Sequence, residues 1–312
     1  CGGGHAGGGI QEGGGRPPPA RRGRLAGRAP AAKLKGKKAL VFGGTSGIGL
    51  AAARQLSELG AAVVAIGRDP SKAGVLEGVQ YEQCDVLDRE GLAKLFDRHA
   101  PFDILVSTAT GGTRAMGPFL QMDLDGFQAS FDKLWGYANV VRLGAPHLAT
   151  TGCIVLVSGA PARRAKPGQI ALASVGASVE QFARVLAAEL APRRINVVCP
   201  GIIETPMFGP EGEERASRLA GATSGHLVPR PGTADEVARA ILFTIHRERL
   251  RDGDHGGRGR GVARRTLRRP DGRPQLPWML LVGRAARCAP FSCHPRPLWT
   301  PAWNRTEQNR TE

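Results

Sequence analysis

The 312-residue sequence lacks several features that would point to particular classes of protein. It has no run of about 18 apolar residues, the length that a membrane-spanning helix needs, so the sequence predicts no membrane contact. Its histidines show no metal-ligand spacing, and we expect no metal site. The six cysteines include no C-x-x-C pair, which favours buried, reduced thiols in a cytosol-like compartment. Tyrosine is scarce, with only Tyr81 and Tyr137 in the chain.

The charge is distributed unevenly and divides the chain into three parts. Of the formal net charge of +16, residues 1–32 carry +4, residues 33–247 carry +4 and residues 248–312 carry +8. The first part consists mostly of Gly, Pro, Arg and Ala, so we expect a disordered tail, because it has too little apolar surface to offset chain entropy. The middle part predicts one folded domain, and the last part a basic disordered tail.

The first part is also Arg-rich and acid-poor, as organelle transit peptides are, but it lacks serine and an amphipathic pattern. We therefore expect a cytoplasmic protein, with import into an organelle as the alternative.

A glycine-rich turn follows the apolar run at residues 39–42. Its spacing is G-x-x-x-G-x-G, from Gly43 through Gly47 to Gly49. Gly43 can adopt backbone angles that a side chain forbids, Gly47 lets the main chain approach a phosphate, and Gly49 lets the next helix pack close to its strand. Because a helix N-terminus presents free N–H groups and a partial positive charge, the turn predicts a pyrophosphate site that also includes Thr45, Ser46 and Ile48.

Apolar runs alternate with helical patterns through the middle part of the chain. The predicted strands lie near residues 39–42, 62–66, 78–83, 103–107, 153–157 and 195–199. This alternation predicts an α/β fold, a doubly wound, Rossmann-like parallel sheet in a single domain. Ligands of such sheets bind beyond the carboxyl ends of the strands.

The residue that follows the second strand bears on the choice of cofactor. An acidic side chain at the end of this strand would bind the ribose hydroxyls of NAD. Gly67 stands there instead and Arg68 follows, which favours the 2′-phosphate of NADP. The alternative is that Arg68 is an ordinary surface charge and that NAD is used.

Motifs at these strand ends resemble those of the short-chain dehydrogenase/reductase family over roughly residues 34–247. They are F-G-G-T-S-G-I-G at 42–49, C-D-V at 84–86, V-S-G at 157–159 and I-N-V-V-C-P-G-I-I-E-T-P at 195–206. The resemblance implies that Gly43, Ser46 and Ile48 lie along the pyrophosphate, Asp85 and Val86 hold the adenine, and Ala109 flanks the ribose. It further implies that the nicotinamide is bordered by Pro200, Gly201, Ile203 and Thr205.

The catalytic residues depart from the family pattern. The resemblance makes Ser158 the catalytic serine, and we expect it to bond the substrate carbonyl. Counting from Ser158, the resemblance expects a Tyr and a Lys at positions that hold Ala171 and Val175. One interpretation is a relocated acid pair, in which Tyr137 gives the proton and Lys133, one helical turn before it, lowers its pKa. The alternative is a solvated Lys133 and a core Tyr137.

The last part of the chain does not read as the final strand of the family. Residues 251–261 can be encoded by codons that give V-T-G-T-T-V-D-V-D-G-G in the next frame, so we infer a frameshift near residue 247. The last strand would then be missing from the sheet edge, unless residues 278–282 replace it. Loss of this C-terminal surface argues against a homo-oligomer.

These observations lead to one main function and two alternatives. The main function is an NAD(P)-dependent oxidoreductase that transfers a hydride between NADP, or NAD, and a small carbonyl or alcohol substrate. A catalytically silent NADP-binding module is the first alternative, because the Tyr-Lys pair is absent. A nucleic-acid binder acting through its basic tails is the second, although the mildly basic middle part without a recognition motif argues against it.

Overall fold

The computed structural model of the chain describes residues 2–3, 34–110, 114–164, 166–246, 267–268, 274–275 and 279–282. Residues 1–31 and 32–312 form separate units, and almost everything described belongs to the second. The predictions of disordered tails, of a frameshift and of nucleic-acid binding through basic segments fall almost wholly outside the described residues.

The centre of the domain is a twisted sheet whose first six strands are parallel. They are β1 (Lys38–Phe42), β2 (Ala62–Gly67), β3 (Val79–Gln83), β4 (Phe102–Ser107), β5 (Leu148–Val157) and β6 (Arg194–Pro200). With β11 (Met279–Val282) at one edge, the order across the sheet is β11-β6-β5-β4-β1-β2-β3. The predicted positions of all six strands are confirmed, because runs of consecutive apolar residues suit strands that are covered on both faces.

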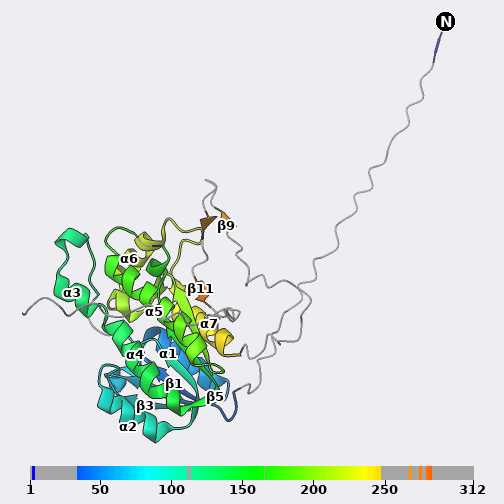
Figure 1. Cartoon of the computed structure of the whole chain (residues 1–312). Coiled ribbons are helices and arrows are strands. Elements are labelled where there is room, and N and C mark those ends of the chain that lie inside the picture. The colour runs from blue at the N-terminus through cyan, green and yellow to red at the C-terminus, as the bar shows by residue number, and fades with distance from the viewer. Residues whose placement is uncertain are drawn as a thin grey trace, which may run out of the picture. The chain divides into compact units, whose positions relative to one another are not determined.

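Helices cover both faces of this sheet (Figure 1). On one face α1 (Gly47–Glu58) and α7 (Ala234–His246) pack against alternate residues of the strands, such as Val41 and Val155. On the other face α2 (Arg89–His99), α4 (Asp132–Gly144) and α5 (Ile170–Glu189) pack against the intervening residues, such as Phe42 and Leu156. The predicted doubly wound α/β fold is confirmed.

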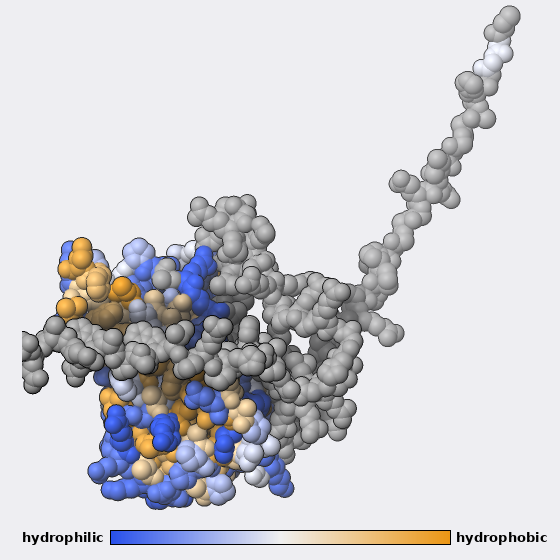
Figure 2. All heavy atoms as spheres, viewed as in Figure 1, coloured by the Kyte–Doolittle hydropathy of each residue, from blue (hydrophilic) through white to orange (hydrophobic). Residues whose placement is uncertain are grey.

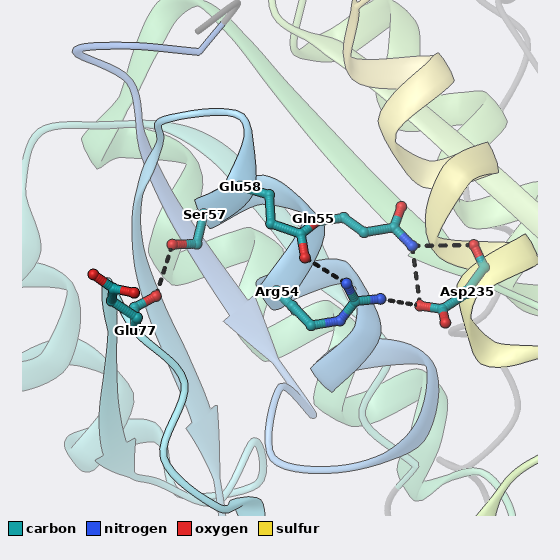
Figure 3. A network of polar contacts seen from close by, with 6 residues as sticks. All are labelled: Arg54, Gln55, Ser57, Glu58, Glu77 and Asp235. Atoms are coloured by element: carbon teal, nitrogen blue, oxygen red, sulfur yellow. Dashed lines mark hydrogen bonds and ion pairs between the residues drawn. The ribbon is translucent and has the colours of Figure 1, made fainter. Parts of the chain in front are cut away.

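Polar contacts on the surface join α1 to α7, two helices far apart in the chain (Figure 3). Arg54 forms ion pairs with Glu58 on its own helix and with Asp235 on α7, and Gln55 donates to the Asp235 carboxylate at 3.1 Å. Ser57 donates to the carbonyl oxygen of Glu77 at 3.1 Å, which ties α1 to the segment before β3. These contacts link α1 to α7 and to the segment before β3, while the buried face of α1 packs on the sheet.

The edge of the sheet beside β6 is occupied by β11 (Met279–Val282). This strand runs antiparallel to β6, with Leu280 opposite Cys199. The sequence left this edge empty unless residues 278–282 filled it, and the structure places part of that segment there. A short hairpin, β9 (Leu267–Arg268) with β10 (Pro274–Gln275), precedes it.

Smaller elements surround the carboxyl edge of the sheet. They are α3 (Leu124–Ala129), α6 (Glu213–Thr223) and the paired short strands β7 (Ile203–Glu204) and β8 (Gly232–Thr233). Single 3-10 turns lie at Pro70–Ala73, Phe119–Gln121, Ala145–His147, Ala160–Ala162 and Pro206–Phe208. Within the described part of the chain, α5 alone has the length and composition to cross a membrane, and here it packs on β5, β6 and α4.

Candidate active site

A cavity of about 860 Å³ lies beyond the carboxyl ends of the parallel strands. Its volume is within the range of sites for small molecules and cofactors. It is lined by the turn after β1, by residues that follow β2 to β6, and by residues near both ends of the segment from Pro206 to His226. We call this segment the lid. Open α/β sheets bind ligands at this edge, and the cavity lies there.

The turn after β1 contributes Gly43, Thr45, Ser46, Gly47 and Ile48 to the lining of this cavity. Gly43 has φ +73°, and a Cβ atom there would lie 2.7 Å from Thr108 Oγ1. Gly47 has φ +49°, and its Cβ atom would lie 3.3 Å from the Thr205 side chain. Side chains are therefore excluded where a phosphate has to approach the backbone.

Gly49 does not line the cavity, although the sequence analysis grouped it with the cofactor-binding residues. A Cβ atom at this position would lie 2.1 Å from the Gly43 carbonyl oxygen. Its role is the predicted close packing of α1 on the turn, which positions the helix N-terminus without contact to a ligand. The turn is further held by Thr108, whose hydroxyl donates to the carbonyl oxygens of Phe42 and Gly43 at 3.2 and 3.3 Å.

The next three strands contribute the residues expected around the adenosine part of a dinucleotide. Arg68, Asp85, Val86 and Ala109 all line the cavity. Arg68 is exposed, and Asp85 accepts a hydrogen bond from the backbone N–H of Leu87 at 2.9 Å, which shapes the loop after β3. These residues come from separate strands, and the parallel sheet brings their carboxyl ends to one edge.

The residues that follow β6 complete the expected cofactor site. Pro200, Gly201, Ile203 and Thr205 line the cavity. The backbone cradle, the N-terminus of α1 and the cavity volume together fit a nicotinamide dinucleotide. With such a cofactor bound, its nicotinamide supplies or accepts the hydride.

Ser158 lines the cavity at the end of β5, and its hydroxyl already has a partner. Its Oγ donates to Glu180 Oε1 at 3.0 Å, and Arg163 binds Glu180 Oε2 at 2.7 to 2.8 Å. A carboxylate only accepts hydrogen bonds, so the single proton of Ser158 lies in this bond. Glu180 was not predicted as the partner of Ser158, because the two residues are 22 positions apart and no motif connects them.

Lys133 also lines the cavity, and its ammonium donates to the Ser158 carbonyl oxygen at 3.3 Å. Burial, followed by the nearby charge of Arg114, lowers the pKa of Lys133 from 10.5 to about 8, and Cys199 acts weakly in the opposite direction. This lysine is therefore a partly desolvated cation beside the strand end that carries Ser158, and not the solvated residue of the alternative interpretation.

Tyr137 lies elsewhere, and the relocated acid pair is wrong for this residue. Its ring is completely buried, it does not line the cavity, and its hydroxyl donates to the carbonyl oxygen of Val157 at 3.0 Å. Burial raises the pKa of Tyr137 far above its ordinary value. Lys133 Nζ does lie 5.7 Å from the centre of the Tyr137 ring, so the two residues share a helix face, but they do not form an acid pair.

Comparison with known proteins agrees with this geometry. The sequence profile described as enoyl-(acyl carrier protein) reductase matches residues 43–249. A 3-oxoacyl-[acyl-carrier-protein] reductase FabG of Thermotoga maritima is 32% identical over 230 residues, which cover 68% of this chain and 91% of the relative. The chain belongs to the short-chain dehydrogenase/reductase family.

Two further relatives extend this assignment. The L-xylulose reductase of Bos taurus is 29% identical over 185 residues, 56% of this chain and 75% of the relative. A solved small-chain dehydrogenase in complex with NADPH is 28% identical with a TM-score of 0.59, covering 69% of this chain and 93% of the other. The present short-chain dehydrogenase/reductase is a nicotinamide-dependent oxidoreductase of small substrates.

This family member carries no Tyr-Lys pair in its cavity wall. Ala171 and Val175 line the cavity at the positions where the resemblance expects the pair, and both are buried. Neither side chain can donate a proton. The cavity wall also contains Arg114, which was not predicted from the sequence. Its position a few residues beyond the fourth strand was the signal that could have indicated it.

Proposed function

We propose that this oxidoreductase reduces a small carbonyl compound with NADPH and that Lys133 donates the proton. The observation that carries the proposal is the position of the Lys133 ammonium, in the cavity wall and 3.3 Å from the Ser158 carbonyl oxygen. A group with a pKa of about 8 is protonated at neutral pH and can release its proton without a large barrier.

In this mechanism Lys133 is the proton donor and Ser158 has a positioning role. The carbonyl carbon gains a hydride, and its oxygen receives a hydrogen bond and then the proton from the Lys133 ammonium, which becomes an amine and recovers a proton from water. Ser158 gives no proton to the substrate, because its hydroxyl is bound to Glu180. Its role is to fix the end of β5 and, with it, the carbonyl oxygen that holds Lys133.

The preference for NADP rests on Arg68. This side chain follows β2 in the cavity wall, and the strand ends in Gly67 instead of the carboxylate that would bind ribose hydroxyls. Asp69, the next residue, does not line the cavity and accepts hydrogen bonds from Ser71. A guanidinium pairs well with a phosphate, since several N–H donors lie in one plane. The relative solved with NADPH supports the same preference.

A catalytically silent NADP-binding protein is the second candidate, favoured by Ala171 and Val175 in the cavity wall. NADPH oxidation with a panel of aldehydes and ketones, measured between about pH 6 and pH 10, separates the two. We expect the rate of the wild type to fall above about pH 8, as Lys133 loses its proton, and Lys133→Met to lose about 100-fold or more in rate.

Gly47→Asp is the control, because it puts a side chain and a negative charge where the backbone faces the phosphates. Its folding is checked by circular dichroism. Turnover by the wild type no faster than by Gly47→Asp would establish the silent alternative, and an unchanged pH profile in Lys133→Met would exclude this lysine as the acid.

A further inference from the structure

Positive side chains dominate the wall of the cavity. Among the described residues that line it, Arg68, Arg114, Lys133, Arg164 and Lys166 are basic, and Asp85 is the one acidic residue. Arg68 and Asp85 follow β2 and β3, at the adenosine end. The remaining part of the wall, beside Ser158 and the lid, therefore contains four cations and, within the described chain, no carboxylate.

Two loops bring three of these cations, Arg114, Arg164 and Lys166, to the same end of the cavity, and Lys133 lies near Arg114. Arg114 precedes Gly117, whose backbone N–H donates to the carbonyl oxygen of Gly168 at 2.9 Å. Gly168 follows Arg164 and Lys166 in the loop before α5. The two loops are thus hydrogen-bonded to each other, and the cations they carry do not belong to unrelated surface segments.

Arg114 lies in the cavity wall and has no acidic partner among the described residues. Its one hydrogen bond to a described residue runs from Nη1 to the Met207 sulfur on the lid, at 2.7 Å. A thioether sulfur is a weak acceptor, and a guanidinium has five N–H donors. Its side chain is exposed, so the donors that Met207 does not use are open to a ligand in the cavity. A guanidinium with no acidic partner among the described residues can bind an anion without first breaking an ion pair.

The apolar surface near this loop does not supply such a partner. Phe119, Leu120 and Leu124 are exposed at the end of the domain that contains α3, where Figure 2 shows hydrophobic surface. These side chains are uncharged and offer Arg114 no ion pair.

We propose that the substrate of this enzyme carries an oxyanion, a carboxylate or a phosphate, that binds to Arg114 at the lid end of the cavity. The proposal rests on the proposed function for its reaction and names the class of carbonyl compound reduced. The planar donors of Arg114 match the two oxygens of such a group, and Lys133 and Arg164 add positive potential around it. A neutral substrate would leave these donors unused.

The experiment compares pairs of carbonyl compounds that differ only in charge. The carboxylate pair is 4-oxopentanoate and its methyl ester, and the phosphate pair is dihydroxyacetone phosphate and dihydroxyacetone. Values of kcat/KM with NADPH are measured for the full-length wild type, for Arg114→Gln and for Arg142→Gln. Arg142 is an exposed cation on α4 outside the cavity, so it is the matched control.

We expect the wild type and Arg142→Gln to prefer the charged member of at least one pair by about tenfold or more. Arg114→Gln should lose that preference. Because the substitution also removes a charge beside Lys133, the quantity compared is the ratio of kcat/KM for the charged and the neutral member, and not the absolute rate. The pair that shows the preference distinguishes a carboxylate substrate from a phosphate substrate. Equal rates for both members of both pairs in the wild type would overturn the proposal.

Anion binding can also be measured directly, which tests the role of Arg114 without any need for turnover. The NADP-loaded protein is titrated with glutarate and with inorganic phosphate in a calorimeter, and we expect one of them to bind to the wild type and to Arg142→Gln but not to Arg114→Gln. Absence of turnover with retained anion binding would count against the proposed reduction alone. Weaker binding of NADP to Arg114→Gln would assign this guanidinium to a cofactor phosphate and overturn the proposal.

Discussion

The lowered pKa of Lys133 predicts how the stability of the protein depends on pH. In the folded state this pKa is about 8, against 10.5 for an ordinary lysine, because the side chain is partly desolvated and lies near Arg114. Between these two values the unfolded chain binds more protons than the folded chain. The free energy of unfolding therefore rises as the pH increases through this interval.

The magnitude follows from the same two values. One pKa unit corresponds to about 1.4 kcal/mol, so the Lys133 charge destabilises the folded state by about 3 kcal/mol at neutral pH. Between about pH 7 and about pH 9.5, loss of the Lys133 charge raises the free energy of unfolding by roughly 2 kcal/mol. Replacement of Lys133 by Met removes the titrating group and should remove this gain.

The assay is urea unfolding of the wild type, Lys133→Met and Lys94→Met at both pH values, followed by circular dichroism. Lys94 is exposed on α2 and serves as the matched lysine. Other titrating groups cancel in the difference between wild type and variant. If Lys133→Met gains as much stability as the wild type, the ammonium is fully hydrated in the folded protein and the reasoning is refuted.

Three further predictions concern other parts of the molecule. Arg68→Ala should weaken NADP binding by about tenfold or more while NAD binding stays the same, and tighter binding of NAD than of NADP to the wild type would contradict the assignment. Glu180→Ala should lower the free energy of unfolding by about 2 kcal/mol, because Ser158 and Arg163 lose their buried partner, and an unchanged urea midpoint would show that the contact is dispensable. In the network of Figure 3, Asp235→Ala should cost less than about 1 kcal/mol, whereas Leu56→Ala in the fully buried part of α1 should cost about 2 to 5 kcal/mol, and the reverse order would contradict the burial argument.

The cofactor half of the candidate site could be predicted because its parts are local. A strand, a glycine turn and a helix N-terminus follow one another in the chain, and the remaining contributors are marked by their position just after an apolar run. Topology then places the ends of parallel strands at one edge, so Asp85 and Ala109 reach the same cavity. The role of Thr108 was not predicted, because its contact with the turn joins residues 66 positions apart in the chain.

The catalytic half could not be predicted to the same extent. Lys133 and Tyr137 are neighbours on a helix, and the sequence alone does not show which faces the cavity. The structure turns the tyrosine into the core, where its hydroxyl binds the β5 backbone, and leaves the lysine in the wall. The roles of Arg114 and Glu180 depend on contacts with residues of other elements, Met207 and Ser158. No sequence motif connects these residues, so the contacts could not be predicted.

The sequence by itself determined the doubly wound sheet, the six parallel strands and the glycine turn, because these depend on hydrophobic periodicity and on backbone freedom within a few residues. Only the tertiary structure decided which charges meet. Lys133 loses hydration beside Ser158, Glu180 accepts a hydrogen bond from the Ser158 hydroxyl, and Arg114 faces the lid without a carboxylate among the described residues. Desolvation and pairing are set by atoms that lie far apart in the chain, and folding alone brings them together.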